Sequence, residues 1–286
     1  MSQITNINLD SLLEIAQRGV RRASVFLALG VNSARDPRLD NYMFPKDVLV
    51  QVLHEGLDQK NVEHFKTEFE KWVVLSGLRE LIETFSVYLD GVYKVGLLIA
   101  IKSGDIKPEL AEDFERSFEW KGIEDKLKTL KDRFGIDTPK GKYLISISKA
   151  RNCLAHRQGV VATHDTDSSG VLRVVWWAID VFAEIPGGQE ISLMPPLPAG
   201  GVILEQGGQI KIRFIDRERE FHLGQVLELT TNDLAEICVL VSLAANEVMS
   251  TVLSFVRSHG IQIDEKIKTE QRKDQISSDD TSSISS

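Results

Sequence analysis

The longest pattern of regularly spaced hydrophobic positions covers residues 62–102, where apolar side chains recur every three or four residues. This spacing predicts one long helix whose apolar stripe faces a core. Residues 8–30 show a shorter pattern of the same kind, and Gly30 is expected to end that helix. A loop rich in turn residues follows, and then a short helix is expected from Lys46 to Leu57.

Three more helices are expected before residue 160. One spans roughly 108–120, and a second, strongly charged one spans 121–134. The third begins at Thr138 and Pro139, because these residue types are preferred at the N-cap and the first position of a helix. Gly159 is a natural stop for it.

After Gly159 the pattern changes to β-branched and aromatic runs separated by glycine pairs. The runs 171–182 and 210–215 predict strands, and three to five antiparallel strands are expected in all. Thr231-Asn232-Asp233 then caps a last long helix, which is expected to pack back on the earlier helices. The predicted fold class is therefore mainly α, an antiparallel helical bundle with a small antiparallel β segment before the last long helix.

These elements divide the chain into five segments. They are N-terminal helices and a loop (1–60), a helical core (61–159), a β-rich insertion (160–230), a C-terminal helix (231–260) and a tail (261–286). The tail is charged and then rich in Ser and Asp, so it is expected to be disordered. No apolar run reaches 18 residues and the first residues lack a signal-peptide pattern, so we expect no membrane span and a cytoplasmic location.

Charge is distributed unevenly along the chain. The net charge of −8 argues against a protein that coats nucleic acids generally. Yet no Asp or Glu occurs between Thr138 and His164, and this window holds five basic residues: Lys140, Lys142, Lys149, Arg151 and Arg157. A basic island in an acidic chain favours a local phosphate site. The alternative is an acid-free window that arose by chance.

The polar residues of the stretch 143–159, YLISISKARNCLAHRQG, carry the candidate chemistry. Asn152 and His156 are four residues apart, so they share one helix face, and the long side chain of Arg151 can reach toward them. A histidine can move a proton near neutral pH, and an arginine can hold a phosphate through two hydrogen bonds. Together these groups suit the removal of a proton from a ribose 2′-hydroxyl, which is the first step of metal-independent RNA cleavage.

The run Arg151-Asn152-Cys153-Leu154-Ala155-His156 resembles the R-N-x-x-x-H motif of HEPN domains (higher eukaryotes and prokaryotes nucleotide-binding). The likeness is looser elsewhere and lies chiefly in the long helix near residues 70–100. It implies an α-helical bundle that pairs as a homodimer, with the two motifs facing each other across the dimer cleft. Many members are toxin or defence ribonucleases that need no cofactor or metal, and a neutralising protein partner fits such a role. Some members only bind nucleotides or partners.

The resemblance also implies residue roles. His156 would be the general base, Arg151 would hold the scissile phosphate, and Asn152 would orient His156 or the phosphate. Glu83 is the candidate for the acidic residue that contacts the motif arginine, and the alternative is that it lies on a solvated face of the long helix. The candidates for flanking phosphates are the basic residues Lys142, Lys149 and Arg157. The expected products are a 2′,3′-cyclic phosphate and a 5′-hydroxyl.

Other interpretations of these residues remain open. The same helix would serve a non-catalytic module that binds a nucleotide or a protein partner, or a scaffold in which Arg151 and His156 form an internal polar network. Cys153 and His156 are three apart, but Cys153 suits a core position better than a thiol nucleophile. The six histidines are scattered and have no metal-ligand spacing. Trp176 and Trp177 should point to opposite faces of a strand, one into the core and one outward.

Overall fold

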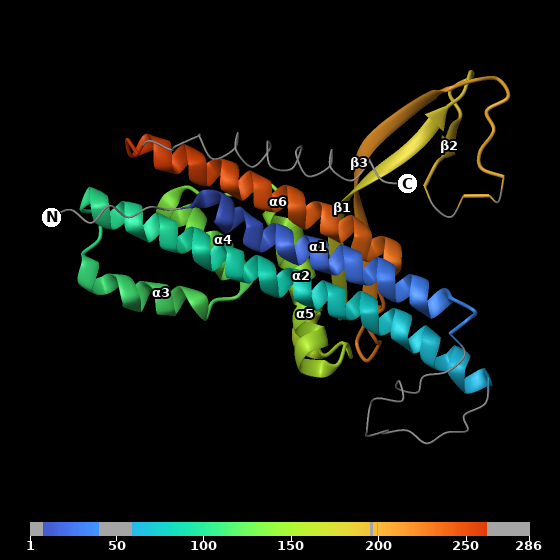
Figure 1. The fold of residues 1–286 in the computed structure, drawn as a ribbon, viewed down its shortest axis with the longest axis horizontal. Coiled ribbons are helices and arrows are strands. Elements are labelled where there is room, and N and C mark those ends of the chain that lie inside the picture. Colours follow the sequence, from blue (N-terminus) through green and yellow to red (C-terminus); the bar gives the residue numbers. More distant parts are fainter. Residues whose placement is uncertain (1–7, 40–58, 195–196, 199, 262–286) are drawn as a thin grey trace, which may run out of the picture.

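Three long helices dominate the computed structural model, which describes residues 8–39, 59–194, 197–198 and 200–261. They are α1 (Leu9–Arg35), α2 (Gln59–Ser103) and α6 (Thr231–Ser258), and α1 runs antiparallel to the other two (Figure 1). The shorter helical elements are η1 (Pro108–Leu110), α3 (Ala111–Glu119), α4 (Ile123–Phe134), α5 (Gly141–Arg157) and η2 (Thr163–Asp165). The strands are β1 (Val171–Glu184), β2 (Glu190–Ser192) and β3 (Gln209–His222). The chain is therefore mainly α with a three-stranded antiparallel sheet, in the order β2-β1-β3, before the last helix, as predicted.

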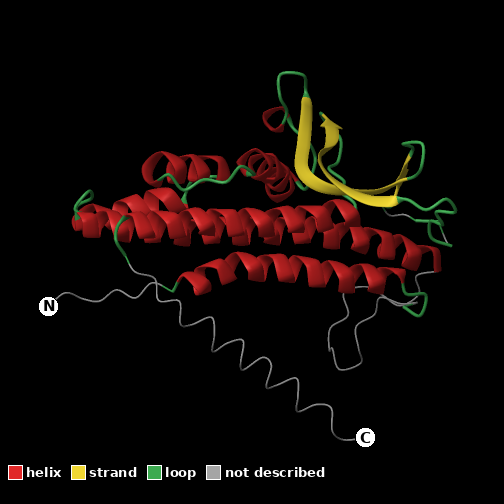
Figure 2. Cartoon of the chain, turned by 90° about the horizontal axis from the view of Figure 1, so that it is seen from above, coloured by secondary structure: helices red, strands yellow, loops and turns green. Residues whose placement is uncertain are grey.

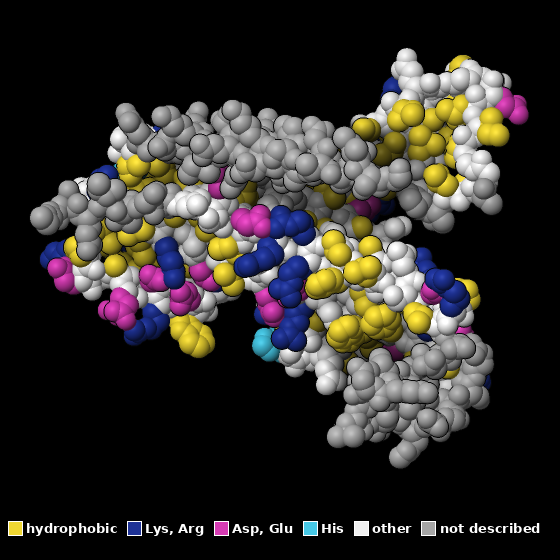
Figure 3. Space-filling model, viewed as in Figure 1, with side chains coloured by type: hydrophobic (Ala, Val, Ile, Leu, Met, Phe, Trp, Pro, Cys, Tyr) yellow, Lys and Arg dark blue, Asp and Glu magenta, His cyan; other side chains and the backbone are white. Residues whose placement is uncertain are grey.

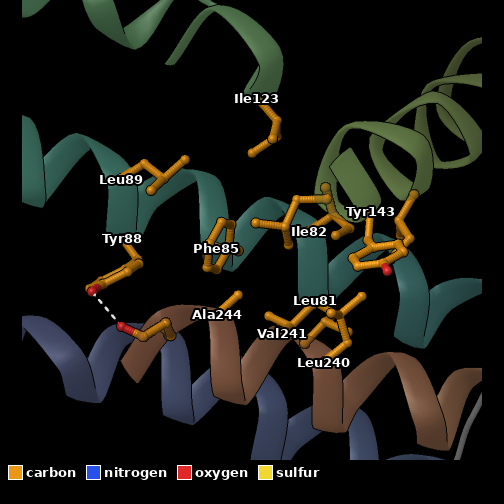
Figure 4. Packing of buried hydrophobic residues seen from close by; sticks show 14 of the residues in the cluster. Leu81, Ile82, Phe85, Tyr88, Leu89, Ile123, Tyr143, Leu240, Val241 and Ala244 are labelled. Carbon is orange, nitrogen blue, oxygen red and sulfur yellow. Dashed lines mark hydrogen bonds between the residues drawn. The ribbon is translucent and has the colours of Figure 1, made fainter. Parts of the chain in front are cut away.

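The helices and the sheet form three layers. Helix α1 covers one side of the pair α2 and α6, while α4, α5 and the sheet cover the other side (Figures 1 and 2). A helix in the middle layer is buried on more than one face, which explains why α2 is apolar over so much of its surface. In Figure 4, Phe85 and Leu81 of α2 meet Leu240 and Val241 of α6, and the Tyr88 hydroxyl donates a hydrogen bond to a carbonyl of α6.

Helices α2 and α6 are also long and apolar enough to cross a membrane, by length and composition alone. In their most apolar 18-residue windows, however, 56% and 50% of the residues are buried inside the protein. The core helix of a soluble protein passes the same test, so the two helices are weak evidence for a membrane protein. Their apolar faces are used in the packing of the three layers.

The first helix does not end at Gly30, as expected, but continues to Arg35. The glycine serves close packing instead, because a Cβ added there would lie 2.7 Å from the Cγ2 atom of Val73 on α2. Gly96 of α2 likewise permits a close approach, since a Cβ there would lie 2.5 Å from the Phe134 ring. A glycine that faces a neighbouring helix is thus not a stop signal.

Four other predicted features differ from the expectation or lie outside the described residues. Helix α5 starts at Gly141 rather than at Pro139. The Thr138 hydroxyl accepts from the Lys140 amide (3.2 Å) and donates to Glu247 of α6 (2.6 Å). The segment predicted as one helix over 108–120 divides into η1 and α3. The short helix expected from Lys46 to Leu57, and the tail after residue 261, fall outside the residues that the structure describes.

Helix α5 runs across the long helices rather than along them, so it stands outside the antiparallel bundle that α1, α2 and α6 form (Figures 1 and 2). Its centre is fixed to β1, where the Ser146 hydroxyl accepts a hydrogen bond from the Val175 amide (2.8 Å) and donates one to the Arg173 carbonyl (3.1 Å). The C-terminal end of α5 extends past the edge of α2 in Figure 1. The fold therefore holds the predicted motif at an exposed end of a firmly anchored helix.

The two tryptophans of β1 alternate as predicted for a strand. Trp176 is fully buried and its indole Nε1 donates to Glu236 of α6 (2.8 Å). Trp177 is only partly buried, and it stacks on Phe214 of β3 with 4.8 Å between the ring centroids. Because this ring is covered by a neighbouring strand, it belongs to the sheet's own packing.

Candidate functional site

One stripe of helix α5 is polar and exposed close to its C-terminal end. Lys149, Asn152 and His156 lie at positions i, i+3 and i+7, so they follow one another along a single face. The opposite face is buried in the core through Leu144, Ile147, Ala150 and Cys153. This amphipathic pattern fixes which side of α5 faces solvent, and it places the three polar side chains together.

The polar stripe forms one wall of a groove of about 420 Å³. The other lining residues come from the end of α5, from η2 and the residues that follow it, and from the start of β1. The lining residues are Lys149, Asn152, His156, Arg157, His164, Asp165, Thr166, Asp167, Val171, Leu172 and Arg173. A groove of this size is within the range of small-ligand sites, and it is large enough for a phosphodiester with part of its nucleosides.

The wall formed by η2 is held in place by Arg157. Its Nε donates to the Asp165 carboxylate (2.8 Å), and a second guanidinium nitrogen donates to the other carboxylate oxygen. Asp165 is only 4% exposed at its side chain and also accepts from the Ala162 amide (2.9 Å). Arg157 lines the groove, but its donors are engaged in this structural contact, which the sequence did not predict.

Arg151 lies beside the groove and does not line it. Its Nη2 donates to Glu83 of α2 (2.8 Å), which is the contact expected for Glu83, and its Nη1 donates to the Asn152 side-chain oxygen (3.1 Å). Glu83 also accepts from Arg79 (2.9 Å). Burial raises the pKa of Glu83, but the hydrogen bonds and charges of the two arginines outweigh it, so the pKa is lowered overall. Two guanidinium groups share one carboxylate, which leaves an excess of positive charge.

The predicted motif is therefore brought together in part. Asn152 connects its two halves, because it accepts from Arg151 and also lines the groove with His156. Within the described part of the chain, the His156 imidazole and the Lys149 ammonium have no hydrogen bond or ion pair with another residue. Both groups are free to meet a ligand in the groove.

Lys142 does not belong to this groove. It precedes His156 by 14 residues of one helix, a rise of about 21 Å, and it pairs with Asp216 of β3 (3.0 Å). The acid-free window of the sequence is likewise neutralised by carboxylates from distant segments, since Lys140 pairs with Glu247. Of the five basic residues in that window, Lys149 alone has no carboxylate partner among the described residues. The basic island of the sequence is thus much smaller in the folded chain.

Sequence reasoning missed the residues that η2 and β1 contribute to the groove. His164 is exposed and faces the same groove as His156. Arg173 pairs with Asp167 and with Glu220 (2.8 Å), so its charge is balanced. The only signal for His164 in the sequence was its place at the edge of the acid-free window, because its proximity depends on how the chain turns after α5.

The thiol of Cys153 is buried in the core, whereas His156 is exposed. Burial raises the pKa of Cys153, which disfavours a reactive thiolate. Cys153 therefore packs the core, as expected, and Cys238 is also a buried free thiol. Across residues 8–39, 59–194, 197–198 and 200–261, no group of three or more His, Cys, Asp or Glu side chains is arranged to hold a metal ion.

A second groove, of about 440 Å³ and mainly apolar, lies between α1 and α2. Its rim includes Phe26, Leu29 and Trp72, which are 54%, 60% and 63% exposed. Figure 3 shows hydrophobic side chains gathered over α1 and α2, beside a strip of basic and acidic ones. Glu80 lines this groove and lies one helical turn before Glu83, so the apolar surface ends next to the motif arginine.

Comparison of the chain with protein-family models, curated proteins and solved structures found no match. The functional assignment therefore rests on the residues of the α5 groove and on their chemistry.

Proposed function

We propose that this chain is a HEPN-type, metal-independent endoribonuclease of the toxin or defence kind, active in the cytoplasm. One observation carries the proposal. At the exposed end of α5, the free His156 imidazole shares a groove with Asn152 and Lys149, and Arg151 is held next to them by Glu83. These are the residue types that RNA cleavage through the 2′-hydroxyl requires, and they match the R-N-x-x-x-H pattern.

In the proposed reaction, His156 accepts the proton of a ribose 2′-hydroxyl in the groove. The 2′-oxygen forms a bond to phosphorus while the bond from phosphorus to the 5′-oxygen breaks. The products are a 2′,3′-cyclic phosphate and a 5′-hydroxyl. Lys149 stabilises the charge on the phosphoryl oxygens from within the groove, and Arg151 adds its positive charge from beside it, where its guanidinium donates to the side-chain oxygen of Asn152. General base catalysis of this kind contributes about 10²–10⁴-fold in rate.

The proposal includes a homodimer that brings two motifs together. The apolar groove between α1 and α2 supports a second copy as its occupant, because exposed apolar patches mark interfaces and this one ends next to the motif. Trp72→Ala should then weaken the dimer, measured by sedimentation, and lower the activity per chain on dilution. A stable monomer with full activity would contradict this part of the proposal.

A second candidate function is a non-catalytic module that binds a nucleotide or a protein partner. The observation that favours it is the direction of Arg151, which points to Glu83 instead of into the groove with His156. In that case the groove would bind a phosphate group through Lys149 without cleaving a bond. Nucleotide binding without cleavage under all conditions would favour this candidate.

The test is cleavage of RNA in the presence of EDTA by the wild type, by His156→Ala and by His64→Ala. His64 is an exposed histidine on α2 outside the groove, so it is a matched control for the loss of an imidazole. The proposal predicts cleavage by the wild type and by the His64 variant, and a loss of about 10²-fold or more for the His156 variant. Equal cleavage by all three would mean that the groove is not the site.

A further inference from the structure

The groove contains a second imidazole that the motif does not include. His164 lies in η2, and its exposed side chain lines the same groove as His156 of α5. In the described residues it has no hydrogen-bond or ionic partner. Two unengaged histidines that line one groove from two different elements need an explanation beyond the resemblance, which supplies one histidine per chain.

The turn that carries His164 is fixed on both sides. On the C-terminal side, Asp165 accepts from Arg157 of α5 and from the Ala162 amide, so the turn is tied to the last turn of the motif helix. On the N-terminal side, the Leu227 amide donates to the Gly159 carbonyl (2.8 Å) and the Val161 amide donates to the Gln225 carbonyl (2.9 Å). His164 is therefore held near the motif by backbone and buried side-chain contacts, and it does not sit on a free loop.

The chemistry of the proposed reaction requires a second proton transfer. When the bond from phosphorus to the 5′-oxygen breaks, the leaving oxygen needs a proton, and His156 is the acceptor in the same step. The other polar groups of the groove suit this task poorly. Lysine and arginine hold their protons too tightly near neutral pH, and the carboxylates of Asp165 and Asp167 are engaged by Arg157 and Arg173.

We infer that His164 is the general acid of this site, donating a proton to the 5′-oxygen as it leaves, and this inference rests on the proposed ribonuclease function. The proton balance is complete within one chain. His156 takes the 2′-hydroxyl proton and becomes an imidazolium, while His164 gives its proton to the 5′-oxygen and becomes neutral. Exchange with water restores both groups. The acid and the base of one cleavage event then come from the same groove.

A substrate whose leaving group needs no proton can distinguish a general acid at position 164 from a residue that only supports the structure of the groove. The assay compares an ordinary RNA oligonucleotide with one in which the bridging 5′-oxygen at the cleavage position is replaced by sulfur. A thiolate leaves without protonation, so loss of a general acid should matter only for the ordinary substrate. The enzymes are the wild type, His164→Ala, His164→Gln, His156→Ala and the control His64→Ala, each checked for unchanged thermal unfolding.

For the ordinary RNA, both His164 variants should lose about 10²-fold or more in rate. For the 5′-thio substrate, they should cleave within a few-fold of the wild type, whereas His156→Ala should be slow on both. Equal losses of the His164 variants on the two substrates, or no loss on either, would overturn the assignment of the acid while leaving the ribonuclease intact. Cleavage of neither substrate by the wild type would overturn the proposed function together with the inference.

Discussion

Replacement of Glu83 by glutamine removes the negative charge of the side chain and keeps its shape. In the structure one Glu83 carboxylate accepts from Arg151 at 2.8 Å and from Arg79 at 2.9 Å. Glutamine keeps the volume but leaves two guanidinium groups close together with no counter-charge. The side chains of Glu83 and Arg151 are 37% and 26% exposed, so the pair lies between an exposed ion pair, worth up to about 1 kcal/mol, and a buried one, whose loss costs about 3–5 kcal/mol. We therefore expect Glu83→Gln to destabilise the fold by about 1–2 kcal/mol.

The measurement is urea unfolding of Glu83→Gln, Arg151→Gln and the double variant. The two residues touch, so their effects should not add, and a coupling energy of about 0.5–1.5 kcal/mol is expected. Glu112→Gln is the control, because Glu112 pairs with Arg116 on the exposed face of α3, where the loss should stay below about 0.5 kcal/mol. Strictly additive effects of the Glu83 and Arg151 substitutions would show that Glu83 does not hold the motif arginine.

Three further predictions concern the fold around the site. Tyr88→Phe removes the hydroxyl that donates to the Ala245 carbonyl (2.9 Å), so the free energy of unfolding in urea should fall by about 0.5–1.5 kcal/mol. Gly96→Ala gains about 1 kcal/mol of helix propensity, but its Cβ would lie 2.5 Å from the Phe134 ring, so a net loss of stability in thermal unfolding is expected. The pKa of Glu83 is lowered in the folded state, so its carboxylate should contribute fully to the free energy of unfolding above its unfolded pKa of about 4.3. That contribution is lost as the pH falls through the folded pKa. The difference in stability between the wild type and Glu83→Gln should therefore shrink below about pH 4.

Local patterns in the sequence were enough to predict the helices and the sheet. The spacing of apolar residues predicts α2 and α6, and the β-branched and aromatic run 171–182 predicts the main strand. The boundary at Gly30 was wrong because a glycine gives the same signal for a helix stop and for a close contact, and only Val73 on another helix distinguishes the two. Tertiary contacts at helix ends, such as the hydrogen bond from Thr138 to Glu247 of α6, could not be predicted for the same reason.

In the candidate site too, features that depend on the helix alone could be predicted from the sequence, and features that depend on distant segments could not. The shared face of Lys149, Asn152 and His156 follows from helical spacing alone. The partners Asp165 and Asp216, which engage two of the predicted phosphate-binding residues, come from outside the helix and depend on the fold. A count of charges along the sequence therefore overestimates the basic surface that remains in the folded chain.

The central claim is that the end of α5 cleaves RNA by attack of a 2′-hydroxyl. The most direct test maps one cleavage position in an RNA oligonucleotide and then replaces the ribose on its 5′ side by 2′-deoxyribose, with EDTA present throughout. The account predicts that the wild type leaves the substituted position uncut and still cuts other positions to 2′,3′-cyclic phosphate ends. Continued cleavage at the deoxyribose position would contradict the account, because no 2′-oxygen is present there to attack the phosphorus.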